Sequence, residues 1–85
     1  MKYMVTELIF KAEKAWYDDN HIHIILSDRK KVSFPIDLNK KLKVATPNQL
    51  NNIEIICNGT GLNWPDLDED LSLLGIMEGR FGKNE

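Results

Sequence analysis

A row of carboxylates in the C-terminal part of the chain has the residue types that bind metal ions or carry out acid/base chemistry. In the stretch WPDLDEDLSLLGIMEG, residues 64–79, four of the five residues from Asp66 to Asp70 are acidic. Aspartates at alternate positions resemble the start of a calcium loop, which also needs a glycine at its sixth position and a glutamate at its twelfth. Counted from Asp66, these positions hold Leu71 and Met77. The spacing therefore argues against a calcium loop.

Two interpretations of these acids remain, one as helix caps and one as a charged binding surface. A short C-terminal helix is predicted from Leu71 to Gly79, and Asp68 to Asp70 directly precede it. Carboxylates in that place accept hydrogen bonds from free backbone N–H groups and offset the positive end of the helix dipole. Capping would leave Asp66 and Glu69 as the spare charges. We expect a partner-binding surface that consists of Asp66, Asp68, Glu69 and Asp70.

Other residues that could carry chemistry have simpler structural interpretations. His21 and His23 have the spacing of many metal ligands, but they alternate with isoleucines and so fit the polar face of a strand. The turn 58–61, Asn-Gly-Thr-Gly, lacks the lysine and the following helix of a phosphate loop. Cys57, the only cysteine, lies in an apolar run that predicts a buried, inert thiol. Because no serine lies in a recognisable catalytic signature either, we expect no catalysis, no metal and no cofactor.

The first half of the chain reads as strands. HIHIILS, residues 21–27, alternates apolar and polar side chains with the period of two of a half-buried strand. Residues 8–17 alternate more loosely, and Asp18-Asp19-Asn20 supplies turn chemistry, so the two segments are predicted to pair antiparallel. A third, short strand covers Val32 to Pro35, with Phe34 in the core and Pro35 as its end, because proline cannot donate to a ladder.

The second half of the chain mixes helix and strand signals. Residues 36–52 are predicted to form two short helical pieces, the second opened by Thr46 as N-cap and Pro47 as first helical residue. Ile53 to Cys57 is the strongest strand signal, and Leu62 to Trp64 is its return partner. The residues expected to have structural roles in this hairpin are Gly59, Gly61, Trp64 and Pro65.

These elements predict an α+β fold: a small antiparallel sheet with short helices packed on one side and a short C-terminal helix. With 85 residues, 42% of them hydrophobic and 28% charged, the chain is expected to be a single compact domain over 1–85. No apolar stretch approaches the length of a membrane span, and no signal peptide is indicated, so we expect a cytoplasmic protein without membrane contact.

The charges are segregated along the chain although the net charge is only −2. Residues 29–43 carry six basic side chains and one acid, whereas residues 44–79 carry six acids and no lysine or arginine. Such segregation favours steered association with a charged partner, or head-to-tail self-association. The basic side chains of the first segment are Arg29, Lys30, Lys31, Lys40, Lys41 and Lys43.

From about residue 11 to 79 the chain resembles a small bacterial family called domain of unknown function 2442. The resemblance rests on the turn at Asp28, on Val32 to Pro35, on Ala45-Thr46-Pro47 with Gln49, on Gly59 to Pro65, on Leu67 to Asp70, and on Leu74 to Gly79. It implies a compact α+β domain that occurs alone or, in longer members, before a DNA-binding helix-turn-helix. It also implies genes often paired with another small protein family in a toxin–antitoxin-like arrangement. Leu50 and Asn63 depart from the arginine and histidine that the family often has.

Together these observations predict a non-catalytic, antitoxin-like protein-interaction module whose acidic segment faces a small protein partner, possibly encoded by a neighbouring gene. The alternative is a nucleic-acid-binding regulator that uses the basic segment 29–43. Because Phe34 is predicted to lie in the core, the lysines of that segment would act without an aromatic partner, and their attraction to phosphates would be weak and salt-sensitive.

Overall fold

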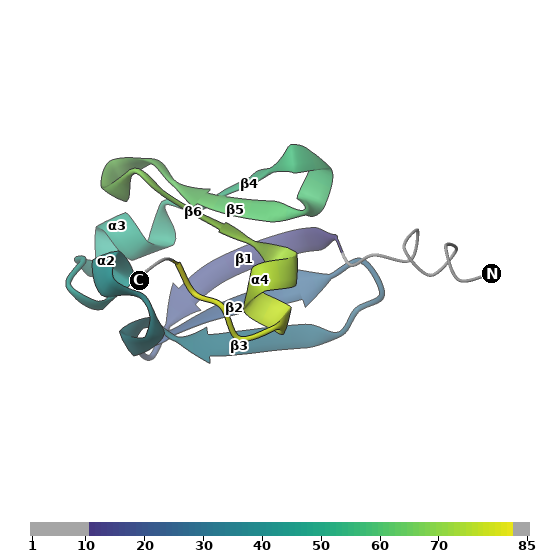
Figure 1. The fold of residues 1–85 in the computed structure, drawn as a ribbon, viewed down its shortest axis with the longest axis horizontal. Helices are drawn as coiled ribbons and strands as arrows, with labels where there is room; N and C mark the ends of the chain where they lie inside the picture. The colour runs from purple at the N-terminus through teal and green to yellow at the C-terminus, as the bar shows by residue number, and fades with distance from the viewer. Residues whose placement is uncertain (1–10, 83–85) are drawn as a thin grey trace.

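The chain forms two three-stranded antiparallel sheets that lie one above the other, with short helices beside and between them (Figure 1). The structure, a computed structural model, describes residues 11–82. The first sheet has the order β1-β2-β3 and the second the order β4-β5-β6. The strands are β1 Ala12–Asp18, β2 His21–Leu26, β3 Lys31–Pro35, β4 Glu54–Ile56, β5 Gly61–Trp64 and β6 Glu69–Ser72. The predicted α+β class is confirmed, but the strands divide between two sheets.

The first sheet follows the predicted alternation. In β2, Ile22, Ile24 and Leu26 are fully buried, whereas His21 and His23 lie on the outer face and are half-buried. Asp19 and Asn20 have φ angles of 50° and 64° and join β1 to β2 in a two-residue turn. The strand predicted over residues 8–17 begins at Ala12 in the described part, and its first residues lie outside the described residues.

Short helices follow or separate the strands. The 3-10 helix η1, Ile36–Leu38, and the α-helix α2, Lys40–Lys43, follow β3; α3 spans Pro47–Asn51 and α4 spans Leu73–Met77. The predicted start of α3 is confirmed, because the Thr46 side chain accepts from the Gln49 backbone N–H and the Gln49 side chain accepts from the Thr46 backbone N–H. None of the helices within residues 11–82 is long and apolar enough to cross a lipid bilayer.

Trp64 anchors the second sheet in the core, as predicted. Its side chain is fully buried on the inner face of β5, and its indole N–H donates to the backbone carbonyl of Leu50 in α3 over 3.1 Å. A buried indole N–H needs an acceptor, and here the acceptor lies in another element. The bond therefore also fixes the distance between α3 and β5. Pro65 then opens the 3-10 helix η3, Pro65–Leu67, which leads to β6.

The prediction of a buried thiol at Cys57 is wrong. The strand predicted over residues 53–57 covers only Glu54 to Ile56, and Cys57 is exposed at the start of the 3-10 turn η2, Cys57–Gly59. Three successive residues in this turn, Cys57, Asn58 and Gly59, have φ angles of 53°, 57° and 91°. A side chain at Gly59 would approach Lys11 Cβ to 2.9 Å, so glycine is required there by its φ and by space.

The predicted boundary of the C-terminal helix is also wrong. Residues 69–72 form β6, and α4 starts only at Leu73, with Ser72 as N-cap accepting from the Gly75 backbone N–H over 2.8 Å. The interpretation of Asp68 to Asp70 as helix caps therefore fails. The segment pairs with β5 as a strand and does not form the first turn of a helix, because Leu71 fills the core position opposite Leu62.

The core lies between the two sheets. Its members come from the inner faces of both sheets and from the helices, and Phe34 is among them as predicted. The buried apolar residues are Ala12, Ile22, Ile24, Leu26, Phe34, Ile36, Leu42, Leu50, Leu62, Trp64, Leu71, Leu73 and Ile76. In the view of Figure 1, α2 and α3 lie at one end of the two sheets and α4 lies in front of them.

Candidate functional site

Three of the four predicted partner-binding acids are exposed around the turn that joins β5 to β6. Asp66 lies in η3, Asp68 takes a left-handed conformation with φ 54°, and Asp70 points outward from β6. We call these three carboxylates the acidic hairpin. Within residues 11–82 none of them has an ion pair with a lysine or arginine. Their negative charge is therefore available to a partner.

Asparagines hold two carboxylates of the acidic hairpin in place. The Asn52 side-chain amide donates to Asp66 over 3.2 Å, and the Asn63 amide donates to Asp70. Asn63 also lies opposite Glu54 in the neighbouring strand β4. Because side chains directly opposite one another share a face, Glu54 extends the negative surface across the outer face of the second sheet.

Glu69, the fourth predicted acid, differs from the other three because its side chain turns inward. It lies opposite Trp64 in the ladder, and only 17% of its side chain is exposed. Its carboxylate accepts from the Asn39 amide over 2.8 Å and lies 3.7 Å from the Lys41 ammonium group. Glu69 is thus no spare charge: it joins the second sheet to α2. The period of two explains the difference, because it alternates 69 and 71 inward with 70 outward.

Asn39 is the residue that sequence reasoning missed. It is 3% exposed, and its side-chain oxygen accepts from the backbone N–H groups of Lys41 and Leu42, which caps α2. Its amide group donates to Glu69 and to the backbone carbonyl of Phe81, 2.8 Å in each case. An asparagine directly before a helical segment is a recognised N-cap signal. The contacts with Glu69 and Phe81 have no local signal, because these residues lie 30 and 42 positions further along the chain.

The predicted basic segment does not form one surface. Arg29 and Lys30 lie in the turn between β2 and β3, whereas α2 carries Lys40, Lys41 and Lys43 beyond the far end of β3 (Figure 1). Lys31 opens β3 itself and is exposed. The six charges are therefore divided between the two ends of a strand.

Two of these lysines are already paired within the chain. Lys30 lies 3.3 Å from the Asp28 carboxylate, and its backbone N–H donates to the same group over 3.0 Å, which lowers the pKa of Asp28. Lys41 donates to the backbone carbonyl of Asp68 over 3.0 Å in addition to its pairing with Glu69. One lysine of the basic segment thus stabilises the base of the acidic hairpin.

The two histidines lie on the outer face of the first sheet, as predicted. Their rings are stacked, with centroids 6.0 Å apart. His21 Nδ1 lies 2.8 Å from the Asp19 carbonyl oxygen, and His23 Nδ1 lies 2.7 Å from the Ser33 hydroxyl. In the described part of the chain, no group of three or more histidine, cysteine or acidic side chains is placed to hold a metal ion.

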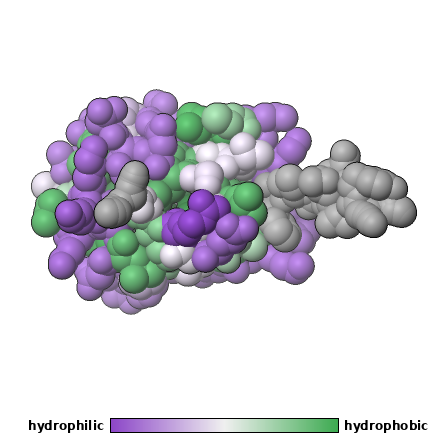
Figure 2. All heavy atoms as spheres, in the orientation of Figure 1, coloured by the Kyte–Doolittle hydropathy of each residue, from purple (hydrophilic) through white to green (hydrophobic). Residues whose placement is uncertain are grey.

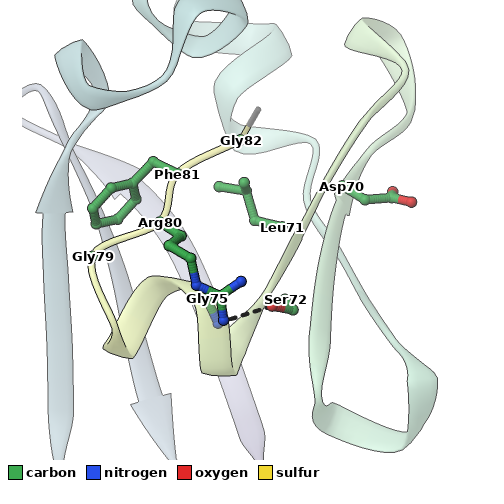
Figure 3. A pocket seen from close by; sticks show the side chains of 8 residues that line it. All are labelled: Asp70, Leu71, Ser72, Gly75, Gly79, Arg80, Phe81 and Gly82. Carbon is green, nitrogen blue, oxygen red and sulfur yellow. Dashed lines mark hydrogen bonds between the residues drawn. The ribbon is translucent and has the colours of Figure 1, made fainter. Parts of the chain in front are cut away.

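An open pocket of about 520 Å³ lies between β6, α4 and the segment that follows α4 (Figure 3). Its polar groups are already used: Ser72 caps α4, and Arg80 is paired with Glu78. Asp70 points away from Phe81 and Arg80 in this view. The pocket is lined by Asp70, Leu71, Ser72, Gly75, Gly79, Arg80, Phe81 and Gly82. Apart from Asp70, Ser72 and Arg80, its lining consists of glycines and the apolar side chains of Leu71 and Phe81.

The face of the molecule seen in Figure 2 mixes hydrophobic and hydrophilic residues rather than showing one large apolar area. Exposed apolar side chains are scattered over several elements, among them Leu38 after β3, Val44 at the end of α2, and Leu74 in α4. Single exposed apolar side chains are common on protein surfaces and carry no functional signal. The acidic hairpin is a more distinctive surface feature than these scattered apolar side chains.

The fold and its surfaces define a small α+β domain built on two opposed antiparallel sheets. The chain belongs to the family described as protein of unknown function (DUF2442), whose profile matches residues 12–82. The resemblance inferred from the motifs is therefore confirmed. A comparison with curated proteins finds no match.

Two solved structures are similar over most of the chain. One is a protein of unknown function from Rhodospirillum rubrum, 39% identical, with a TM-score of 0.82 over 88% of this chain and 93% of that one. The other is an uncharacterised protein from Chromobacterium violaceum, 32% identical, with a TM-score of 0.81 over 95% of this chain and 76% of that one. Both support the fold, and their descriptions assign no activity.

Proposed function

We propose that the protein is a non-catalytic, antitoxin-like interaction module whose acidic hairpin binds a small basic partner protein in the cytoplasm. One observation carries the proposal: Asp66, Asp68 and Asp70 are exposed together around one turn, and within residues 11–82 none of their carboxylates has an ion pair with a lysine or arginine. A concentrated negative surface of this kind steers a positively charged protein during encounter and fixes its orientation.

The base of the hairpin supports the proposal because it is held from inside the molecule. Glu69 is bound by Asn39 and Lys41, and the Lys41 ammonium group also binds the carbonyl of Asp68. A binding loop that is ordered before the encounter loses less conformational entropy on binding. Glu69 thus makes the loop rigid, and the three carboxylates of the acidic hairpin remain for recognition of the partner.

The gene arrangement implied by the family resemblance names the first partner to test, the small protein encoded beside this one. We would co-express the two proteins and measure capture of the partner at about 50 mM salt. The expected result is a complex that weakens steeply as the salt concentration rises, since surface charges are screened. If the two proteins do not co-purify even at low salt, the proposal fails.

A charge-matched pair of variants locates the surface. The triple variant Asp66→Asn, Asp68→Asn, Asp70→Asn should weaken binding about tenfold, mainly through slower association. The control carries three neutralisations on the first sheet and its turns: Glu13→Gln, Asp19→Asn and Asp28→Asn. Asparagine suits the left-handed positions 19 and 68, so both variants should fold. Equal weakening by the two variants would show that net charge, not the acidic hairpin, drives binding.

The alternative, a nucleic-acid-binding regulator acting through residues 29–43, receives less support from the geometry. Its six cations lie at two ends of β3, and Lys30 and Lys41 are paired with Asp28 and Glu69. No observation on this segment favours it over the acidic hairpin as the working surface.

A further inference from the structure

The outer face of the first sheet carries a row of stacked rings. Trp16 in β1 lies directly opposite His23 in β2, and His21 follows two positions away on the same face. The Trp16 and His23 ring centroids are 5.3 Å apart with an interplanar angle of 27°, and those of His23 and His21 are 6.0 Å apart at 25°. We call these three side chains the aromatic platform.

Core formation does not explain this platform. The apolar side chains of β2 fill the inner face, where Ile22 and Ile24 are fully buried. The three rings occupy the opposite face and remain partly exposed. Outer faces of antiparallel sheets are usually polar, which accounts for the two histidines but not for the tryptophan stacked on them.

Two lysines converge on the platform from both sides. The Lys14 ammonium group lies 5.9 Å from the Trp16 ring centroid, and that of Lys31 lies 5.8 Å from it. Lys14 and Lys31 both lie opposite Ile25, one in β1 and the other in β3. The sheet register therefore places a row with two cations directly beside the row formed by Trp16 and His23.

Hydrogen bonds fix the imidazole rings. A carbonyl oxygen can only accept, so His21 Nδ1 must carry the proton that it donates to Asp19 over 2.8 Å. His23 lies between the Ser33 hydroxyl, 2.7 Å from Nδ1, and the Asp18 carbonyl, 3.3 Å from Nε2. Held in this way, the rings present a fixed surface and lose little freedom when a ligand stacks on them.

We propose that the aromatic platform binds single-stranded nucleic acid. A base would stack on Trp16, the end ring of the row, because His23 is itself stacked between Trp16 and His21. The phosphates would contact Lys14 and Lys31. Flat rings flanked by cations match a chain of flat bases joined by anions, and such stacking tolerates any base sequence. A duplex does not fit, because its base faces are covered by their neighbours in the stack. Of the basic segment 29–43, this surface uses only Lys31.

The charges around the platform are distributed unevenly, with opposite signs at its two ends. Asp18 lies opposite His21, which puts a carboxylate at the end of the platform away from the two lysines. Phosphates should therefore pass along the side of Lys14 and Lys31. The second sheet, with its acidic hairpin, points away from this face, so the two surfaces can be tested separately.

The first experiment measures the binding of a labelled ten-nucleotide oligo-dT and oligo-U by fluorescence anisotropy at about 50 mM salt. Both should bind, and should quench the emission of Trp16 while the buried Trp64 changes little. Trp16→Ala should weaken binding about 5- to 150-fold, the range found for one stacked base. Trp16→Phe, which keeps a flat ring, should retain most of the affinity. Circular dichroism and thermal melting verify that each variant is folded.

The second experiment compares two double variants with the same change in charge. Lys14→Ala with Lys31→Ala removes the cations at the platform, whereas Lys40→Ala with Lys43→Ala removes two from α2. If two phosphates are contacted, the slope of log affinity against log salt should be about −1.4 for the unmodified protein. The slope should approach zero for the Lys14→Ala, Lys31→Ala variant and should stay unchanged for the Lys40→Ala, Lys43→Ala variant.

Several results would overturn the proposal. These are no oligonucleotide binding at about 50 mM salt, equal loss in the two lysine variants, unchanged affinity in Trp16→Ala, or duplex DNA binding as tightly as the single strand. Concentration-dependent self-association that Trp16→Ala abolishes, without oligonucleotide binding, would assign the platform to a second copy instead. Because no partner protein is present in these experiments, their outcome is independent of the proposed function of the acidic hairpin.

Discussion

The two sheets are built alike but are held together differently. The strands of the first sheet are five to seven residues long and its β1–β2 turn has two residues, so its backbone ladders are extensive. The strands of the second sheet have only three or four residues. That sheet depends on side chains that reach other elements: Trp64 to Leu50, and Glu69 to Asn39. A short sheet is thus stabilised by specific anchors where a longer one relies on its backbone.

The outer faces of the two sheets differ as well. The first carries the aromatic platform with Lys14 and Lys31, and the second carries the carboxylates of Glu54 and Asp70 with Asn63 between them. The inner faces are apolar except at Glu69, whose carboxylate is bound by Asn39. Burial constrains the inner residues in the same way on both sheets, so the distinct properties of the molecule reside in its outer residues and in the anchors.

The largest effect is expected from removing the main anchor of the second sheet. Trp64→Ala deletes a fully buried ring and leaves the Leu50 carbonyl without its donor, which should lower the free energy of unfolding by about 3–5 kcal/mol. A domain of this size has little more stability than that, so the variant should be unfolded at room temperature. Thermal melting followed by circular dichroism measures the loss.

The same substitution on the other sheet provides the control. Trp16→Ala removes a partly exposed ring from an outer face and should cost less than about 1 kcal/mol. If the two tryptophan variants melt at similar temperatures, the distinction between an anchored second sheet and a ladder-held first sheet is wrong.

A smaller but still large effect is expected at Asn39. Asn39→Ala removes the N-cap of α2 and the donors to Glu69 and Phe81, and should cost about 2–4 kcal/mol. Asn39→Asp keeps the cap but loses both donors and sets a second carboxylate beside Glu69. Urea unfolding should find Asn39→Asp nearly as unstable as Asn39→Ala. Recovery of wild-type stability in Asn39→Asp would reduce the role of Asn39 to that of a helix cap.

The smallest effect is expected on the outer face of the second sheet. Asp66→Asn leaves an amide that can still accept from Asn52, and should change the free energy of unfolding by less than about 0.5 kcal/mol. Urea unfolding measures this value, and the same variant should reduce partner capture at low salt. A stability loss above 1 kcal/mol would mean that Asp66 belongs with the anchors and not with the binding surface.

Local patterns in the sequence predicted the parts of the fold that depend on local physics. The period of two located β2 and its buried face, the Thr46-Pro47 pair located the start of α3, and Trp64 was correctly placed in the core. Each of these signals acts within a few residues, where backbone geometry and capping preferences decide the outcome.

The errors concern places where a distant strand decides. Residues 69–72 have the composition of a helix start, but pairing with β5 makes them β6, and the helix begins at Leu73, two residues later than predicted. Cys57 follows an apolar run, but it belongs to the connection between β4 and β5 and does not pair in the β-ladder. Glu69 was predicted as a spare charge and the platform was missed for the same reason, because Asn39 and Trp16 meet their partners only through the tertiary fold.

The two-residue turn of Asp19 and Asn20 has a consequence for how this chain tolerates changes in length. The turn sets which residue of β1 faces which residue of β2. Because side chains alternate between faces, a single inserted residue that shifted the pairing by one position would turn every side chain of the affected strand over. Isoleucines would then meet water and histidines the core. Insertions at this turn should therefore be the least tolerated between strands of the first sheet, whatever their composition.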